Sequence, residues 1–347
     1  MCIRDRNNIA ILCPSAFDYI LNKTGNMLIR YKPESVSCII DSDKAGLKAQ
    51  DVLSYGGNIP VVANFDEAQQ FEPNTIVIGS APQGGFITEV YRKELRSAIK
   101  YGCDIYSGMH QFLNDDEELS LLANEKGTKI YDLRRPPNPP HFSKGSWKDR
   151  KTKVLLIVGT DCDTGKMTTA WEISERLRKK GKNIEFIGTG QTGILLSGHG
   201  IPVDAVIGDF MAGEIEHAID QINEDKDLII VEGQGSLTNM YYAGVTLGLL
   251  HGSMPDYMVM TDEPKRKLDV TGYKMASISS VMDLHISLMN NFKQSKFLGI
   301  NLLTLHMNAG DALKTIQEVE KRFQIPATDL IRFGNRKLID NIIEEIS

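Results

Sequence analysis

The chain has 347 residues, of which 41% are hydrophobic and 24% charged, and its formal net charge is −6. This length has room for two domains of ordinary size, and the composition is that of a globular protein. The negative charge gives no general attraction to nucleic acid or anionic lipid. No stretch reaches the roughly 18 apolar residues of a membrane span, so we expect neither nucleic acid nor a membrane as a partner.

The five cysteines are scattered, and no two have the C-x-x-C spacing of a zinc or redox site. The chain opens without the apolar segment of a secretory signal. We therefore expect reduced thiols and a cytoplasmic location. Residues 1–6 (MCIRDR) fit nothing that follows them and are excluded from the fold prediction.

Short apolar strands alternate with helical segments in the first part of the chain. The predicted strands are 8–13, 35–41, 59–63, 74–78 and a strand from 104, and the predicted helices are 45–55, 65–70 and a helix after 85 that ends near 100. Because apolar strands that alternate with helices are typical of parallel sheets, this order predicts a doubly wound α/β domain.

Two features of this first part are candidates for function. Gly79–Gly85 is a glycine-rich loop directly after a strand, where open α/β sheets bind ligands, but it lacks the G-x-G-x-x-G pattern of dinucleotide sites. His110 also follows a strand, and a lone histidine is more often structural than catalytic. Neither feature by itself identifies a ligand.

A proline-rich segment, 134–140 (RRPPNPP), marks a domain boundary, because it can form neither a helix nor an interior strand. We predict an N-terminal domain over 7–140, a linker over 141–152 and a C-terminal domain over 153–347. Arg134 and Arg135 are candidates for binding a substrate carboxylate or phosphate, and two solvated linker arginines are the alternative.

The stretch 154–169 (VLLIVGTDCDTGKMTT) organises the C-terminal domain. An apolar strand enters a glycine-bounded loop, and a helix over 166–179 follows. Inward-pointing N–H groups, the helix N-terminus and a lysine are the means by which such loops bind phosphate. The spacing departs from G-x-x-x-x-G-K-[ST], since Met167 occupies the position of the metal-binding hydroxyl. The candidate cofactor-binding residues are Gly159, Thr160, Asp161, Cys162, Asp163, Thr164, Gly165, Lys166, Met167 and Thr168.

Two further strands of this domain end in polar, glycine-rich loops. Strand 183–187 leads into 188–193 (GTGQTG), and strand 227–232 ends in Glu232 before 233–235 (GQG). Glu232 is a candidate to hold Mg²⁺ on a bound phosphate or to act as a general base, and a buried glutamate without a role is the weakest alternative. The candidate substrate-binding residues from these loops are Gly190, Gln191, Thr192 and Gln234.

Two other polar residues are candidates for the site. Asp209 precedes a predicted helix over 210–221 and is either its N-cap or a contact to substrate or metal. His251 lies in a glycine-flanked segment before strand 257–261 and is either an acid/base catalyst or a structural residue. A strand at 297–301 and further helical sequence complete the domain.

Several segments carry a resemblance to known families. GTDCDTGK and VEGQGS resemble dethiobiotin synthetase and related P-loop proteins, in which the loop holds ATP and the glutamate associates with Mg²⁺. A longer set resembles the DUF1611 family over residues 8–347: GTDCDTGKMTTA, IGTGQTGI, GDFMAGEIEHA, VEGQGSL, GVTLGLLHGSMPD, VIGSAPQGG, SGMHQFL and DLRRPP. This resemblance implies a Rossmann-like N-terminal domain joined to a P-loop NTPase-like C-terminal domain, both of the α/β class.

The DUF1611 resemblance also implies D-glutamate N-acetyltransferase activity, which uses acetyl-CoA in D-amino-acid catabolism. Loop 159–168 would then hold the phosphates of CoA, with Lys166 as the counter-charge. Glu232 or His251 would accept the proton of the amine, and N–H groups of loops 188–193 or 233–235 would stabilise the oxyanion. The substrate carboxylates would pair with cations, for which the candidates are Arg134, Arg135 and Lys274.

Two alternatives stay open. One is an ATP- and Mg²⁺-dependent enzyme of the dethiobiotin-synthetase kind, which activates a carboxylate with the metal held by Thr168, Glu232 and Asp161. Met167 counts against it, because the hydroxyl that grips Mg²⁺ is missing there. The other is a nucleotide- or CoA-binding protein without catalysis. In each case we expect a small-molecule ligand and a homo-oligomer, the common state of enzymes of this size.

Overall fold

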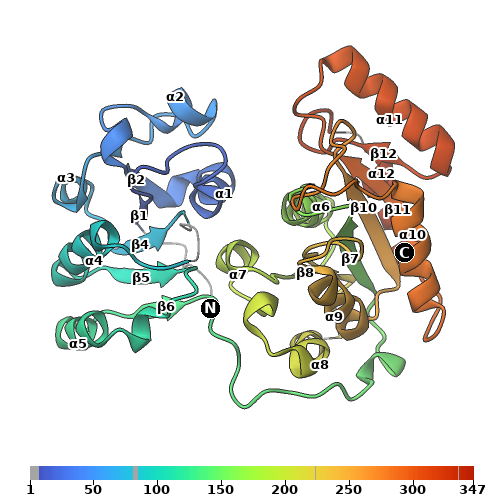
Figure 1. The fold of residues 1–347 in the computed structure, drawn as a ribbon, viewed down its shortest axis with the longest axis horizontal. Coiled ribbons are helices and arrows are strands. Elements are labelled where there is room, and N and C mark those ends of the chain that lie inside the picture. Colours follow the sequence, from blue (N-terminus) through green and yellow to red (C-terminus); the bar gives the residue numbers. More distant parts are fainter. Residues whose placement is uncertain (1–7, 81–84, 223, 335) are drawn as a thin grey trace. The chain divides into compact units, whose positions relative to one another are not determined.

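The structure is a computed structural model, and it describes residues 8–80, 85–222, 224–334 and 336–347. The chain divides into two units, residues 8–135 with 194–198, and residues 136–193 with 199–347. Among the described residues each unit contains one six-stranded sheet (Figure 1). Residues 1–6, and residues 81–84 of the predicted glycine loop, lie outside the described residues.

The sheet of the N-terminal unit has the strand order β3-β2-β1-β4-β5-β6, and all its strand pairs are parallel. Its strands are β1 (Ile9–Leu12), β2 (Val36–Ile40), β3 (Val61–Val62), β4 (Thr75–Ile78), β5 (Asp104–Ser107) and β6 (Ile130–Asp132). After β3 at one edge, the chain crosses back past β2 and β1 and forms β4 on the other side of β1. This reversal is the doubly wound topology that the strand–helix alternation predicts.

Helices cover the sheet of the N-terminal unit. They are α1 (Lys23–Tyr31), α2 (Ala49–Leu53), α3 (Phe65–Ala68), α4 (Glu89–Tyr101) and α5 (Glu117–Lys126). Buried residues of α3, α4 and α5 form one apolar core with alternate residues of β1, β2 and β4. The predicted helix 45–55 is shorter in the structure, because Lys48 is extended and forms a β-bridge with Pro60 directly before α2 begins.

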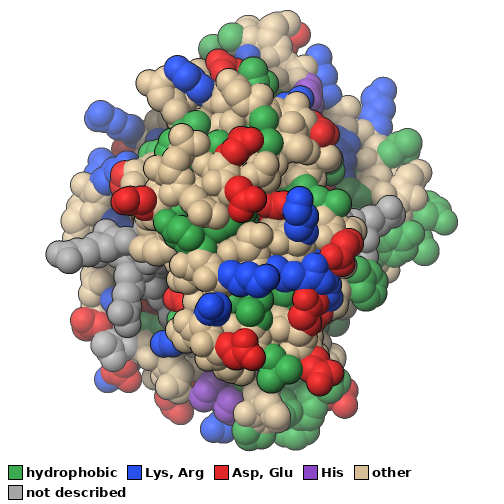
Figure 2. Space-filling model, turned by 90° about the vertical axis from the view of Figure 1, so that its left-hand side faces the viewer, with side chains coloured by type: hydrophobic (Ala, Val, Ile, Leu, Met, Phe, Trp, Pro, Cys, Tyr) green, Lys and Arg blue, Asp and Glu red, His purple; other side chains and the backbone are tan. Residues whose placement is uncertain are grey.

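Charged side chains join two of these helices at the surface. Arg92 of α4 forms ion pairs with Asp116 and Glu118, which begin α5, and Arg96 pairs with Glu118 as well. The Arg92 guanidinium holds the pKa of Asp116 below its usual range. Acidic and basic side chains are interleaved on the face shown in Figure 2. This side therefore carries charges of both signs rather than a field of one sign.

The sheet of the C-terminal unit has the order β12-β11-β10-β7-β9-β8, again with parallel pairs. Its strands are β7 (Val154–Gly159), β8 (Ile184–Ile187), β9 (Leu228–Val231), β10 (Tyr257–Asp262), β11 (Lys296–Leu302) and β12 (Ala327–Thr328). The strand before the predicted phosphate loop, β7, lies between β10 and β9. Its carboxyl end therefore opens between the ends of those two strands.

Helices lie on both faces of this second sheet. They are α6 (Lys166–Lys179), α8 (Gly208–Asp220), α9 (Ala243–Ser253), α10 (Ile278–Met289), α11 (Ala309–Phe323) and α12 (Lys337–Ile346). A further helix, α7 (Gln191–Ser197), follows β8, and its residues from 194 onward belong to the N-terminal unit. Buried residues of α8 to α11 share one core with alternate residues of β7, β9, β10 and β11, and α6 contacts α12 outside that core. In the described part of the chain, no helix combines the length and apolar character needed to cross a bilayer.

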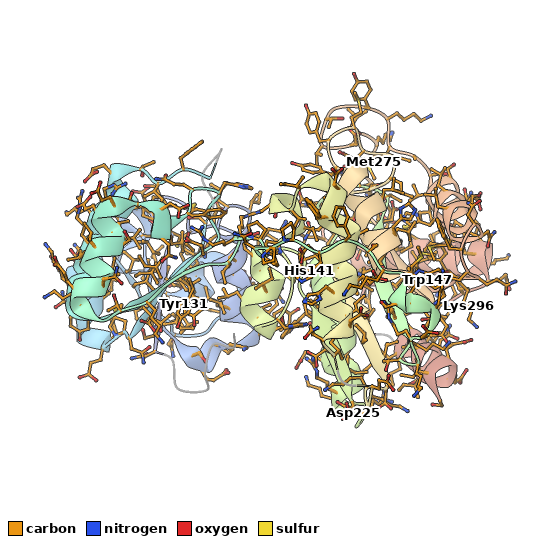
Figure 3. The ribbon with its side chains drawn as sticks, turned by 90° about the horizontal axis from the view of Figure 1, so that it is seen from below. Tyr131, His141, Trp147, Asp225, Met275 and Lys296 are labelled. Atoms are coloured by element: carbon orange, nitrogen blue, oxygen red, sulfur yellow. The ribbon has the colours of Figure 1, made fainter. Side chains whose placement is uncertain are left out.

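The segment predicted to be a linker packs on α8. The buried carboxylate of Glu214 accepts hydrogen bonds from the N–H of His141 (2.7 Å) and from its ring Nδ1 (3.1 Å). Glu216, also buried, accepts from the N–H groups of Lys144 (2.5 Å) and Ser146 (2.6 Å). Since buried carboxylates need donors, these bonds hold the segment on the C-terminal unit, where Figure 3 labels His141. Residues 136–152 accordingly belong to the same compact unit as α8.

Candidate functional site

The loop between β7 and α6 has the backbone of an anion-binding loop. Gly165 adopts a φ of 89°, which favours glycine, and α6 begins at the next residue. Gly165 occupies the N-cap position and has no side chain with which to cap the first turn of α6. A helix start without a cap keeps its N–H groups and its positive potential for an anion.

Lys166 lies inside this loop. Its Nζ donates a hydrogen bond to the backbone oxygen of Asp161 (2.6 Å), and the side chain is buried. Its Cδ is 3.2 Å from the position that a Cβ would take on Gly159 and 3.1 Å from that of Gly233. The lysine stem thus passes between the ends of β7 and β9, with its charge held at the loop.

Asp161 is buried, and protein donors surround its carboxylate. These donors are the Nδ2 of Asn239 (2.7 Å), the N–H of Val270 (2.9 Å) and the guanidinium of Arg266. Arg266 also donates to the backbone oxygen of Cys162 (2.9 Å). The sequence analysis placed Asp161 against the cofactor and considered it for Mg²⁺. In the structure, this carboxylate joins the loop to two neighbouring segments.

The loop threonines have structural partners as well. Thr160 Oγ1 donates to Asp262 Oδ1 (2.6 Å), and the hydroxyls of Thr164 and Thr261 are 2.7 Å apart. Thr169, in α6, accepts a hydrogen bond from Asn301 Nδ2 (2.8 Å). These bonds fix the loop to β10 and β11. The remaining candidates that are partly or fully exposed are Cys162, Asp163, Gly165, Met167 and Thr168.

Glu232 brings the two other glycine loops together. Its Oε2 accepts a hydrogen bond from the N–H of Thr189 (2.9 Å), and its Oε1 accepts from Nε2 of Gln234 (3.3 Å). Gly190 lies beside the Gln234 amide, and Gly193 lies against the Glu232 carboxylate. The structure thus brings Gly190 and Gly193 of one loop and Gln234 of the other to one buried carboxylate, at the ends of the neighbouring strands β8 and β9.

We expect Gly193→Ala to disturb this cluster. A Cβ at Gly193 would lie 2.1 Å from Glu232 Oε2, so the carboxylate or α7 must shift. The matched control is Gly208→Ala, because a Cβ there meets nothing within 4 Å and alanine favours a helix over glycine by roughly 0.5–1 kcal/mol. Urea unfolding should show a loss of stability of about 1–3 kcal/mol for Gly193→Ala and none for Gly208→Ala. Equal stabilities of the two variants would contradict the placement of Glu232.

Asp262 is a site residue that the sequence analysis missed. It is the last residue of β10, next to the loop, and its carboxylate accepts a hydrogen bond from the Thr160 hydroxyl. Burial is the main cause that raises the pKa of this carboxyl above its usual value. Its signal was present in the sequence, since YMVMTD, like LIIVE, is an apolar strand that ends in an acid. Asp262 and Glu232 therefore flank the loop from the two strands beside β7.

His251 lies elsewhere. It is in the last turn of α9, where its ring packs edge-on against Phe292 with the ring centroids 5.4 Å apart. Two residues later, the backbone oxygen of Ser253 accepts a hydrogen bond from Arg150, before β7 begins. This is the amino-terminal edge of the sheet, opposite the loop, so the structure does not bring His251 together with the loop candidates. Burial lowers its pKa and so favours the neutral ring.

Asp209 is exposed in the first turn of α8, and the N-cap position belongs to Ile207. The predicted helix at 210–221 thus begins two residues earlier, and the N-cap interpretation is wrong. Asp209 contributes charge near a helix start, which the helix dipole favours.

The two arginines have contacts inside the N-terminal unit. Arg134 is buried and its Nε donates to the backbone oxygen of Gly108 (2.7 Å), while Arg135 pairs with Asp115 (2.6 Å) and lies over the ring of Phe112. Arg134 is therefore not a solvated linker residue, whereas Arg135 is exposed and ion-paired. They fasten the end of β6 to the segment that follows β5.

His110 follows β5 and borders an open cavity of about 780 Å³ in the N-terminal unit. Burial, followed by the charge of Arg134, lowers the pKa of its imidazole. The other residues that line the cavity are Gln111, Phe112, Asp115, Asp116, Glu117, Glu118 and Leu121. The cavity is acidic, and several of its carboxylates are already paired with arginine.

The fold and the site define a two-domain α/β protein with a phosphate-binding loop in its second domain. The chain belongs to the DUF1611 family, described as a domain of unknown function: it matches the family's P-loop domain over residues 141–339 and its Rossmann-like domain over residues 42–136. The predicted family and fold class are therefore confirmed.

Curated relatives and a solved structure resemble the chain over most of its length. The D-glutamate N-acetyltransferase of Tritonibacter scottomollicae is 38% identical over 279 residues, which cover 80% of this chain and 83% of that protein. The enzyme of the same name from Pseudoalteromonas sp is 33% identical over 281 residues, with the same coverage. The crystal structure of a DUF1611 family protein from Anabaena variabilis superimposes with a TM-score of 0.91 at 29% identity, and covers 97% of this chain and 99% of that one. The chain is thus an enzyme of the acyltransferase class.

Proposed function

We propose that this protein transfers the acetyl group of acetyl-CoA to the amino group of D-glutamate, a reaction of D-amino-acid catabolism. The observation that carries the proposal is the match to two D-glutamate N-acetyltransferases over four-fifths of the chain. The phosphate-binding loop supports it, because CoA carries a pyrophosphate and a 3′-phosphate.

The residues of the loop suit the phosphates of CoA. The uncapped start of α6 offers N–H donors, and Lys166 offers a full positive charge. Met167 brings no hydroxyl to the place where P-loop enzymes hold Mg²⁺. A pyrophosphate that is bound but not cleaved has less need of that metal ligand, so this substitution favours CoA over ATP hydrolysis.

The reaction requires a base and a group that stabilises negative charge. The amine nitrogen attacks the thioester carbon, the C–N bond forms, and the C–S bond breaks to release CoA as a thiolate that takes up a proton. Asp262 is the base that we favour, because its raised pKa is closer to neutrality than that of an ordinary carboxylate. Glu232 is the alternative base, although both of its oxygens accept hydrogen bonds within the protein.

The decisive experiment measures thiol release from acetyl-CoA with D-glutamate and with L-glutamate in parallel, without ATP. Thiol release with D-glutamate alone, matched by formation of N-acetyl-D-glutamate, is the expected result. Silence with both enantiomers, together with Mg²⁺-dependent release of phosphate from ATP, would overturn the proposal in favour of the dethiobiotin-synthetase type of chemistry. Tight CoA binding without any turnover would favour the non-catalytic alternative.

A further inference from the structure

We propose that the hairpin 265–275 is a second binding element for the acetyl donor, which recognises its 3′-phosphate and adenine, and that Asp161 holds this hairpin against the phosphate loop. The inference rests on the proposed function, since it assigns part of the donor to a surface of the same site. It adds a subsite outside the loop itself.

The hairpin is attached to the loop at three points. Arg266 pairs with the Asp161 carboxylate and donates to the backbone oxygen of Cys162 (2.9 Å), and the N–H of Val270 donates to Asp161 (2.9 Å). Consecutive Cα atoms are 3.8 Å apart. The distance between the loop and the residues next to Arg266 and Val270 is therefore no greater than the length of a nucleotide.

The hairpin has a defined backbone of its own. The N–H of Met275 donates to the oxygen of Lys267 (2.9 Å), and the N–H of Asp269 donates to the oxygen of Tyr273 (2.7 Å). The Asp269 carboxylate accepts the N–H groups of Thr271 and Tyr273, which closes the turn. Figure 3 labels Met275 at the foot of this loop, whose side chains project outward.

The exposed residues of the hairpin match a phosphorylated nucleoside. Lys265, Lys267 and Lys274 are exposed, and among the described residues none of the three forms an ion pair. Tyr273 is 59% exposed and Leu268 is 55% exposed. Ammonium groups bind phosphate as point charges, and an aromatic ring stacks on a base. Four basic residues and one acidic residue lie between 265 and 275, so the charge complements an anion.

Asp161 is the positioning residue of this arrangement. It is 105 residues from Arg266 in sequence and 78 from Asn239, and it brings both segments to the loop. Asn239 in turn accepts the N–H groups of Tyr241 and Tyr242. The Asp161 carboxylate thus sets the border of the loop on two sides.

The test compares acetyl-CoA with 3′-dephospho-acetyl-CoA as donors. In the double variant Lys265→Ala/Lys267→Ala we expect the preference for acetyl-CoA, measured as the ratio of kcat/KM values, to fall about tenfold, which corresponds to about 1.4 kcal/mol. The loss should appear in KM, and the kinetics with the dephospho donor should not change. The matched control is Lys314→Ala/Lys321→Ala on α11, where both lysines are exposed and no change is expected. An unchanged preference in the hairpin variant would overturn the proposal.

Two single variants separate the parts of the proposal. Tyr273→Ala should raise KM for both donors alike, because both carry adenine, whereas Tyr273→Phe should retain wild-type values. Asp161→Asn should raise KM for both donors more than it lowers kcat, because the hairpin loses its ionic anchor. If Tyr273→Ala and the wild type have the same kinetics, the hairpin does not bind the adenine of the donor.

Failure of the proposed function has a different signature. In that case the wild-type protein releases no thiol from either donor, and calorimetric titration with CoA and with 3′-dephospho-CoA replaces kinetics. If the wild type binds CoA more tightly than 3′-dephospho-CoA and the double lysine variant does not, the subsite is supported even though the reaction is not. Equal affinity for the two compounds would overturn it.

Discussion

Replacing Lys166 by alanine is expected to lower kcat/KM for acetyl-CoA by about 10²-fold, the usual effect of removing one well-placed donor to a negatively charged group. Lys166 is buried at the loop, with its Nζ on the Asp161 oxygen and its stem between the ends of β7 and β9. When the cationic group is removed, the phosphates lose their one full counter-charge from this loop. Steady-state kinetics with varied acetyl-CoA measures the effect.

Lys179→Ala is the matched control for this variant. Lys179 is at the opposite end of the same helix, α6, and is exposed. It should leave kcat/KM unchanged, because a charge in the last turn of a helix of this length is far from the loop. If Lys166→Ala and Lys179→Ala have the same small effect, the loop does not hold the donor, even if transfer to D-glutamate is observed.

Asp262→Asn is expected to lower kcat by about 10²–10⁴-fold, the typical contribution of a positioned base. Asparagine retains an oxygen that can accept the Thr160 hydroxyl, but it cannot take a proton from the amine. In the wild type, the acidic limb of the pH profile of kcat/KM should lie above the ordinary range of an aspartate, because burial raises this pKa. The variant should lack that limb.

The effect of Asp262→Asn on stability should have the opposite sign to its effect on activity. A carboxyl whose pKa is higher in the folded state than in the unfolded state keeps its proton longer when folded. The free energy of unfolding therefore falls as the pH rises from the unfolded pKa through the folded pKa. Asparagine has no charge to desolvate, so thermal unfolding at pH 7 should give an equal or higher Tm than the wild type.

Glu232→Gln decides between the two carboxylates. If Asp262 is the base, Glu232→Gln should lower kcat less than Asp262→Asn and should retain the acidic limb of the pH profile. The reverse order, with the limb absent only in Glu232→Gln, would assign the base to Glu232. It would leave Asp262 as a partner of Thr160 in the structure of the loop.

Local sequence patterns were sufficient for the part of the C-terminal unit that matters most. The predicted helix 166–179 has the observed bounds of α6, and Gly181 follows it with a φ of 81°. The apolar strand, the glycine next to the lysine and the amphipathic helix all lie within a few residues of one another. Such features depend on backbone geometry and on neighbours in sequence, which is why the sequence predicts them.

Helix α1 shows where local patterns fail. It contains Gly25 and Asn26, two poor helix formers, and was not predicted. Met27, Leu28 and Ile29 are buried in the structure, so packing against the sheet stabilises the helix despite its propensity. Segment 141–148 is a second example. Its polar sequence indicates a linker, but hydrogen bonds to Glu214 and Glu216 hold it on α8.

By itself, the sequence determined the α/β class, the two domains, the phosphate loop and the glycine loops at strand ends, since each follows from residues that are near in the chain. Only the tertiary structure decided which charged groups meet. In it, Asp161 pairs with Arg266, Asp262 lies beside Thr160, and His251 lies at the opposite edge of the sheet. The order of the strands sets these distances, and strand order depends on contacts between residues that are far apart in sequence.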